Sequence, residues 1–325
     1  MSSAAPAPDY LVVGHLCLDY TLSVLSEGRS TPPGASEAAA AEAGPEPFGG
    51  ACPELSRRAR GKLRRRVEGL GGTAAYAALT ARALGRRPAI VTSAADDLDL
   101  APLGGTPIVR VPSARSTTFR NEYAGGARRQ HLLARAATLE AAAVPADWRG
   151  ASIVHLAPIA GEFSPSLQAL FSGSDLVGLT PQGWMRKWDE AGLVSYASWT
   201  PALQAIERVD IVVVGVEDVG GDEAELERLA TACRLLVATE GPRGARVYWN
   251  RDVRRFPSPA ADPVDPTGAG DIFAASFFIR YHQTRDPWEA ARFANVLAST
   301  SVTRRGLAGV PTSEEAKQAA MVWAR

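Results

Sequence analysis

The chain has 325 residues, 46% of them hydrophobic, and its 35 Lys and Arg residues balance 35 Asp and Glu residues. This composition suits a globular protein with a sizeable core, and the balanced charge excludes an overall bias toward nucleic acid or anionic membranes. The 3 cysteines lack CxxC spacing, and no apolar run approaches the roughly 18 residues of a membrane span. We therefore expect a cytoplasmic protein without a disulfide framework, a structural zinc or an export signal.

Short β-branched runs alternate with Ala-, Leu- and Glu-rich stretches along most of the chain. Several runs, such as IVVVG, are apolar throughout, as expected for strands that are buried on both faces. The alternation predicts an α/β fold with a mostly parallel sheet and helices on both of its faces. The runs lie at residues 10–18, 89–92, 152–156, 175–179, 210–214 and 235–239.

Two regions break the alternation. Residues 26–66 begin with Ser, Pro, Gly and Ala low complexity and end in the basic run RRARGKLRRR. The first half lacks large apolar side chains, so we expect it to be disordered, and for the basic run we favour a solvated loop face over a grip on phosphates or nucleic acid. Residues 108–137 read as β-strands around a turn at 124–127, which predicts a small antiparallel accessory sheet.

The sequence VDPTGAGD, residues 264–271, immediately precedes the apolar run IFAASFFIRY. Pro266 favours an extended backbone before it, so we expect a helix to begin just beyond. Gly268 and Gly270 allow a ligand to approach closely, and free N–H groups would face outward at the helix N-terminus from Ala269, Gly270 and Asp271. The motif therefore predicts an anion hole, which a buried helix at 272–281 holds rigidly.

Asp271 is unusual in an anion site, because a carboxylate repels a bound phosphate. Its placement is explained if it accepts a proton. Beside a transferring phosphoryl group, an aspartate can deprotonate an attacking hydroxyl while backbone donors and Mg²⁺ neutralise the phosphoryl oxygens. The alternative is structural, with Asp271 capping its helix and the glycines only turning the chain.

Four motifs together resemble the PfkB (ribokinase-like) family of ATP-dependent carbohydrate and nucleoside kinases. They are VVGHLCLD at 12–19, GGTAAY at 71–76, TEGPRG at 239–244 and DPTGAGD at 265–271. The resemblance implies a ribokinase-like three-layer α/β sandwich with a mostly parallel central sheet and a small β-sheet lid, all in a single domain of residues 1–325. It implies lid strands near residues 20–25, 62–70 and 106–137, with a disordered insert at 26–60.

The resemblance also assigns roles by position. The catalytic base corresponds to Asp271, and the anion hole around the γ-phosphate corresponds to Gly268, Ala269 and Gly270. The phosphate acceptor would face Asp19, Gly71, Gly72 and Tyr76. The nucleotide would be bound by Thr239, Gly241, Gly244, Thr267 and Asn295. Each glycine has an alternative role as a turn residue, and for Gly244 the two roles stand equal.

Two positions depart from the family pattern. Tyr76 stands where members usually carry an asparagine that binds substrate hydroxyls. Its hydroxyl and stacking face would suit a different polyol or a base, and the alternative is packing within an Ala-rich helix that runs to Gly85. The family's NxxE pattern, which organises Mg²⁺, is reduced to GVED at 215–218, where the candidate metal-binding residues are Glu217 and Asp218.

The loop TPQGWMRKW at 180–188 follows a predicted strand, at the edge where open α/β sheets bind ligands. Arg186 or Lys187 could touch the substrate or ATP. The two tryptophans could instead simply anchor the loop, and this is the interpretation that we favour. No GxxxxGK[ST] or GxGxxG motif occurs, which argues against a P-loop NTPase and a dinucleotide-dependent dehydrogenase.

The sequence thus predicts an ATP-dependent phosphotransferase that uses Mg²⁺ and acts on a hydroxyl of a small sugar or a polyol such as an inositol. A nucleoside kinase of the same fold and a catalytically inactive ribokinase-like binding or interaction protein are the alternatives. The altered NxxE pattern and Tyr76 favour the inactive protein, whereas the intact Asp271 and its anion hole oppose it. A monovalent cation and a homodimer are compatible with the resemblance, and the expected partner is a small molecule.

Overall fold

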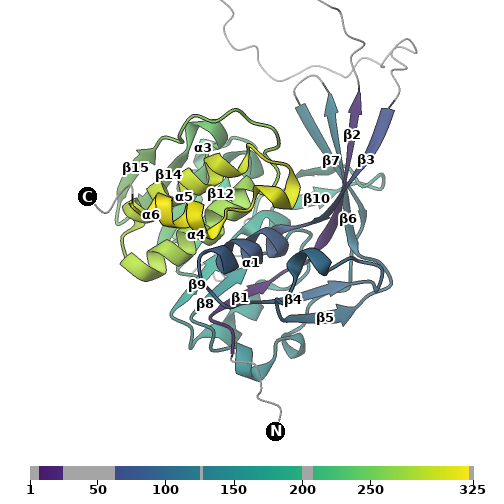
Figure 1. Cartoon of the computed structure of the whole chain (residues 1–325), viewed down its shortest axis with the longest axis horizontal. Helices are drawn as coiled ribbons and strands as arrows, with labels where there is room; N and C mark the ends of the chain where they lie inside the picture. Colours follow the sequence, from purple (N-terminus) through teal and green to yellow (C-terminus); the bar gives the residue numbers. More distant parts are fainter. Residues whose placement is uncertain (1–6, 25–62, 125–126, 200–207, 322–325) are drawn as a thin grey trace, which may run out of the picture.

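The computed structural model describes residues 7–24, 63–124, 127–199 and 208–321. A large sheet with helices on both faces forms the body of the molecule, and a smaller sheet extends from one end of it (Figure 1). The expected insert at 26–60 lies outside the described residues, so its disorder stays a prediction. Within the described ranges, no helix is both long enough and apolar enough to cross a membrane.

In the described part of the chain, the large sheet has nine strands in the order β15-β14-β13-β12-β9-β8-β1-β4-β5. Neighbours from β13 to β5 pair in parallel, and only β14 pairs antiparallel with β13 and β15. The predicted mostly parallel sheet is therefore confirmed. The strands are β1 (Tyr10–Val13), β4 (Pro88–Ala94), β5 (Ile108–Pro112), β8 (Ile153–Leu156), β9 (Leu176–Leu179), β12 (Ile211–Gly215), β13 (Leu235–Thr239), β14 (Ala245–Trp249) and β15 (Asp252–Phe256).

Helices cover both faces of the large sheet. The α-helices are α1 (Thr73–Ala83), α3 (Glu223–Ala232), α4 (Ala269–Thr284), α5 (Pro287–Ser301) and α6 (Ser313–Met321). Short 3₁₀ helices are η1 (Ala101–Leu103), η2 (Ala141–Ala143), η3 (Ala146–Trp148), η4 (Pro165–Phe171), η5 (Pro181–Trp184), η7 (Val216–Val219), η8 (Gly241–Arg243) and η9 (Gly306–Gly309). Because strand residues alternate between faces, Tyr10 and Val12 face a core shared with α1, α4 and α5, whereas Leu11 and Val13 face one that includes α3. The predicted three-layer sandwich is therefore confirmed.

The central helix α4 is apolar on nearly all sides and is buried, as its sequence predicts. Phe273, Phe277 and Phe278 are at most 2% exposed, and burial of each ring stabilises the fold by roughly 1.5–3 kcal/mol. The Phe278 ring lies against β9 at Gly178, where an added Cβ would come within 2.6 Å of the ring. A larger residue at position 178 would therefore displace the helix that carries Asp271.

The small sheet has the order β3-β2-β6-β7 and consists of β2 (Cys17–Val24), β3 (Leu63–Gly71), β6 (Thr117–Ala124) and β7 (Ala127–Ala134). One expectation about it was wrong. The strand β5 falls within the predicted lid range 106–137 but is the edge strand of the large sheet, because its side chains pack against both cores of that sheet. The antiparallel pairing predicted around 124–127 is confirmed by β6 and β7, while β2 and β6 run in parallel. Local sequence patterns specify a strand but not its neighbour.

A buried polar network joins the two sheets where the chain passes from β1 to β2. The Glu162 carboxylate is fully buried and accepts hydrogen bonds at 2.7–3.0 Å from three backbone amides, those of His15, Ile159 and Ala160. The His15 ring donates from Nε2 to the Ala137 carbonyl at 2.9 Å and accepts from Thr117 Oγ1 at 2.7 Å. Burial lowers the pKa of His15, in keeping with a neutral ring. The network fixes the direction in which β2, and Asp19 on it, leaves the large sheet.

Candidate active site

Two helix N-termini meet at Asp271. This residue lies in the first turn of α4, and Thr73, the first residue of α1, donates a hydrogen bond from Oγ1 to Asp271 Oδ1 at 2.7 Å. Burial raises the pKa of Asp271 to about 6; the Thr73 hydrogen bond and Arg186 act to lower it, and the charges of Asp218 and Asp19 act to raise it. A carboxyl with this pKa exchanges protons near neutral pH, which suits a general base.

A glycine and a tyrosine shape the turn into α4. Gly268 is the N-cap residue with φ 80°, and an added Cβ there would collide with the Tyr76 ring. Tyr76 is 2% exposed and packs among apolar residues of α4, α5 and α6. Burial, followed by the charges of Asp19 and Asp271, raises the pKa of its phenol. The ring therefore packs, as the structural alternative expected, and a role for its hydroxyl toward an acceptor stays a prediction.

The predicted anion hole has two candidate donors rather than three. The Ala269 amide donates to the Pro266 carbonyl at 3.2 Å, so the expectation that this amide is free was wrong. The amides of Gly270 and Asp271 stand in the first helical turn, where a helix offers no acceptor of its own. An added Cβ at Gly270 would meet no atom within 4 Å, so there is space for a ligand beside these two amides.

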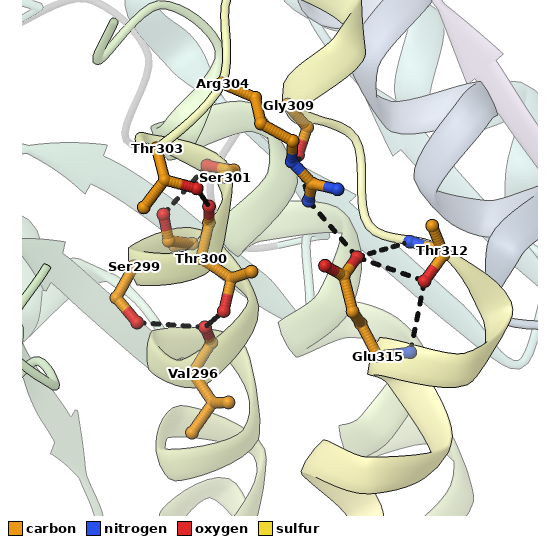
Figure 2. Close-up of polar contacts among 10 residues, drawn as sticks. Val296, Ser299, Thr300, Ser301, Thr303, Arg304, Gly309, Thr312 and Glu315 are labelled. Carbon is orange, nitrogen blue, oxygen red and sulfur yellow. Dashed lines mark hydrogen bonds and ion pairs between the residues drawn. The ribbon is translucent and has the colours of Figure 1, made fainter. Parts of the chain in front are cut away.

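The loop before α4 is hydrogen-bonded to the segment that follows α5. The Asp265 carboxylate accepts hydrogen bonds at 2.9 Å from the amides of Thr267 and Gly306, one on each oxygen. Figure 2 shows how this segment is tied to α6, because the Glu315 carboxylate accepts hydrogen bonds from two of its residues, Arg304 and Thr312. Thr267, which was assigned to the nucleotide, thus has its amide engaged in the turn, and its predicted contact would use its hydroxyl.

Asp19 stands beside the double glycine that opens α1. An added Cβ at Gly71 would collide with Asp19 Oδ2, so only glycine leaves room for this carboxylate. Gly72 has φ 89°, and a Cβ there would lie 2.8 Å from a backbone carbonyl oxygen of the β1–β2 connection. The Cys17 thiol donates to Asp19 Oδ2 at 3.6 Å. The structure thus brings Asp19, Gly71 and Gly72, three of the predicted acceptor-side residues, together near Asp271 and adds the buried Cys17.

Of the two candidate metal-binding residues, Asp218 rather than Glu217 acts on Asp271 through its charge. The Asp218 carboxylate accepts hydrogen bonds from Gln182 Nε2 at 2.8 Å and from the Gly215 amide at 3.2 Å, and its charge raises the pKa of Asp271. Glu217 is exposed. Among the residues that the structure describes, no group of three or more His, Cys, Asp and Glu side chains could hold a metal ion. A Mg²⁺ ion at Asp218 would complete its shell with water and phosphate oxygens, as this ion commonly does.

On the predicted nucleotide side, two of the assigned residues turn inward. Asn295 is 4% exposed, and its Nδ2 donates to the Phe256 carbonyl at 2.9 Å. Gly244 has φ 96°, and an added Cβ would collide with the same carbonyl oxygen. Contacts with the end of β15 therefore explain both residues, and for Gly244 they confirm the turn alternative. Thr239 and Gly241 lie at and after the carboxyl end of β13, half-buried and exposed respectively, where a ligand can reach them.

Two polar residues of the site were not assigned from the sequence, namely Thr73 and Gln182, and Arg186 was named only as a possible contact of the substrate or ATP. Gln182 and Arg186 come from the loop after β9, which forms η5 and a short hairpin of β10 (Arg186–Trp188) and β11 (Val194–Tyr196). In this loop Trp184 is an anchor, since its Nε1 donates to a backbone carbonyl at 3.0 Å, but Trp188 is 39% exposed. The favoured interpretation was therefore right for one tryptophan only. The sequence does carry a signal for these residues. Gln182 and Arg186 are polar residues shortly after a strand, and Thr73 is a threonine at the start of a helix.

Comparisons with known proteins agree with this geometry. Residues 212–314 match the model of the pfkB family carbohydrate kinases. Ribokinase from Bacillus subtilis is 40% identical over 93 residues, which cover 28% of this chain and 32% of that protein. Inositol 3-kinase from Zea mays is 31% identical over 158 residues, which cover 47% of this chain and 40% of that protein. The matched stretches thus span less than half the length of these two relatives.

The fold is shared over nearly the whole chain. A solved structure of a pyrophosphate-dependent kinase in the ribokinase family, complexed with a pyrophosphate analog and myo-inositol, has a TM-score of 0.71. The likeness covers 95% of this chain and 99% of that one, at 16% sequence identity. The family match contains the DPTGAGD motif, and the common fold extends to the small sheet at the other end of the chain. Residues 212–314 are thus similar to the pfkB family carbohydrate kinases, and the chain as a whole has the ribokinase-like fold.

Proposed function

We propose that the protein is an ATP-dependent kinase that transfers the γ-phosphoryl group to a hydroxyl of a small sugar or a polyol such as an inositol, with Asp271 as the general base. The observation that carries the proposal is the Asp271 carboxyl itself, which stands at the N-terminus of a buried helix with its pKa raised to about 6. A carboxylate that only capped its helix would be stabilised as the anion, and its pKa would be lowered. The direction of the shift therefore favours a catalytic role.

In the proposed reaction, the acceptor hydroxyl gives its proton to Asp271 while its oxygen forms a bond to the γ-phosphorus. The bond from that phosphorus to the bridging oxygen breaks in line, and its electrons leave with ADP. The amides of Gly270 and Asp271 donate to the phosphoryl oxygens as negative charge shifts onto them. Asp19 accepts hydrogen bonds from other hydroxyls of the acceptor and so orients it. Thr73 holds the Asp271 carboxylate in position.

The residues present fit ATP and Mg²⁺. Thr239 and Gly241 are reachable at the end of β13, and the Asp218 carboxylate is held in place by Gln182 and Gly215. When bound, Mg²⁺ would supply positive charge to the phosphate oxygens. A monovalent cation, a homodimer and a cytoplasmic location are expectations that follow from the family resemblance alone.

A polyol acceptor is favoured over a nucleoside. The Tyr76 ring is buried, so the stacking face that a nucleobase would have used is not available. The inositol 3-kinase relative supports the same class. A catalytically inactive binding protein is disfavoured, because Asp271, its Thr73 partner and the two first-turn amides are assembled. Pyrophosphate is an alternative donor, which the similar structure of a pyrophosphate-dependent kinase suggests.

The test is a screen of the purified full-length protein for phosphoryl transfer. Sugars, inositols and nucleosides are each supplied with Mg²⁺ and either ATP or pyrophosphate, and phosphorylated product is measured. We expect product with ATP and a sugar or polyol. Product with nucleosides alone would contradict the acceptor class, and product with pyrophosphate alone would contradict the donor. No product with any combination would contradict the kinase function.

A further inference from the structure

We propose that Arg186 is a further catalytic residue, whose guanidinium contacts the transferring phosphoryl group and neutralises negative charge on it. The inference rests on the proposed kinase function and adds a cation to the chemistry described above. Arg186 begins β10, directly after the loop that leaves β9 at the carboxyl edge of the large sheet. Ligands bind at this edge in open α/β sheets.

The Arg186 side chain is held between the two sheets. Its Nη1 donates to the Ile159 carbonyl at 3.3 Å, in the segment that follows β8 of the large sheet. Its guanidinium also lies over the Phe119 ring of β6, with 5.7 Å to the ring centroid. Phe119 is 3% exposed and is the register partner of Asp19 on β2. A contact with both sheets therefore places this cation beside the acceptor carboxylate.

The charges around the site favour such a cation. Asp19 and Asp218 act on Asp271 as like charges, and Arg186 opposes them. Arg186 also acts to lower the pKa of the buried Cys17 thiol beside Asp19. An incoming phosphoryl group brings further negative charge beside these half-buried carboxylates, and partial burial weakens the screening of that repulsion. A guanidinium offers a planar fork of N–H donors that matches two phosphoryl oxygens, and it stays charged at every working pH.

The neighbouring residue provides a matched control. Lys187 is exposed, whereas Arg186 is half-buried, and successive strand residues point to opposite faces. A variant of Lys187 removes the same charge from the same strand without touching the site. A substitution at Arg186 leaves the other titratable groups around Asp271 in place, namely Asp218, Asp19, Cys17 and Tyr76, and removes the charge that acts to lower the pKa of Cys17.

The test compares Arg186→Gln, Arg186→Lys and Lys187→Gln in the full-length protein, with the donor and acceptor found by the screen. We expect Arg186→Gln to lower kcat by about 10²–10³-fold, as loss of one transition-state donor does elsewhere, with an unchanged melting temperature. Arg186→Lys should recover part of the rate, because it keeps the charge but loses the fork. Lys187→Gln should match the parent. The acid limb of kcat/KM should move to higher pH in Arg186→Gln only, because its missing charge raises the pKa of Asp271.

A second readout does not depend on turnover. Carbon-13 NMR of labelled aspartate carboxyls follows the titration of Asp271, whose signal is identified by its loss in Asp271→Asn. If the parent protein is inactive but Arg186→Gln still raises the pKa of Asp271, the result would contradict the kinase function and support the position of Arg186 beside Asp271. If the parent is active, the inference would be overturned by an Arg186→Gln variant that keeps kcat within about twofold and leaves the acid limb unmoved. A change of about twofold is too small for the loss of a charged donor. A rate loss in Arg186→Gln and Arg186→Lys that only followed loss of folded protein would overturn it as well.

Discussion

The Thr73 hydroxyl donates a hydrogen bond to Asp271 Oδ1 at 2.7 Å across 198 positions of sequence. The bond joins the first turns of α1 and α4 and favours the charged form of the carboxyl, against the burial that raises its pKa to about 6. Because Thr73 directly follows Gly71 and Gly72, the double glycine before α1 and the motif that carries Asp271 form one structural unit.

Thr73→Val should raise the pKa of Asp271 further. A hydrogen bond to a charged group contributes about 1.5–3 kcal/mol, which corresponds to roughly one to two pKa units. The base works when deprotonated, so the acid limb of kcat/KM should move from about pH 6 in the parent toward pH 7 or above. The measurement is the pH profile of kcat/KM. Thr73→Ser should keep the parent profile, and an unmoved limb in Thr73→Val would refute the role of the hydroxyl.

Gly268→Ala and Gly270→Ala should distinguish a glycine that is needed for folding from one that is needed for phosphate binding. Position 268 has φ 80°, and its Cβ would collide with the Tyr76 ring, so Gly268→Ala should lower the melting temperature and the activity together. Position 270 has open space around it, so Gly270→Ala should melt like the parent while its methyl group obstructs the bound phosphate. Thermal unfolding and steady-state kinetics of both variants provide the check. Full activity in Gly270→Ala would argue against phosphate binding at this turn.

Asp218→Asn should weaken the response to Mg²⁺. If Asp218 contributes to the cation site, its loss should raise the Mg²⁺ concentration for half-maximal rate by about 10-fold or more. Removal of its charge should also lower the pKa of Asp271 and move the acid limb to lower pH. Titration of the rate with Mg²⁺ measures the first effect. Glu217→Gln is the matched control, because Glu217 is exposed, and an equal response in the two variants would contradict the assignment.

Asn295→Leu should affect stability rather than nucleotide binding. The substitution leaves the buried Phe256 carbonyl without its donor, at a cost of about 1–3 kcal/mol in the free energy of unfolding. We expect a lower melting temperature and an ATP KM close to that of the parent. A KM for ATP that rises severalfold without loss of stability would instead show that Asn295 binds the nucleotide.

The strands and helices of the body were predictable because their residues carry the signal locally. Fully apolar runs such as IVVVG become strands buried on both faces, and the apolar run after Asp271 becomes the buried helix α4. The position of β5 was not predictable, since Ile108 to Pro112 reads as a strand in either sheet, and its membership depends on packing partners far away in the sequence.

The site was predictable where backbone conformation restricts the residue type. Gly72 and Gly268 have positive φ angles and no room for a side chain, so these two glycines mark real turns. The use of polar side chains was harder to predict. In the sequence Asn295 reads as a candidate nucleotide-binding residue, but its side chain donates a hydrogen bond to the buried Phe256 carbonyl. The partnership of Gln182 with Asp218 links loops 36 positions apart, and only the sheet order brings the two together.

The central claim is that Asp271 removes the proton from the acceptor hydroxyl, and Asp271→Asn tests it most directly. The measurement is kcat/KM of parent and variant with the acceptor found by the screen, at pH 5 to 9, beside their melting temperatures. Loss of a general base should lower kcat/KM by about 10²–10⁴-fold and abolish the acid limb near pH 6, while the variant stays folded. A folded Asp271→Asn protein with the rate and pH profile of the parent would contradict the account.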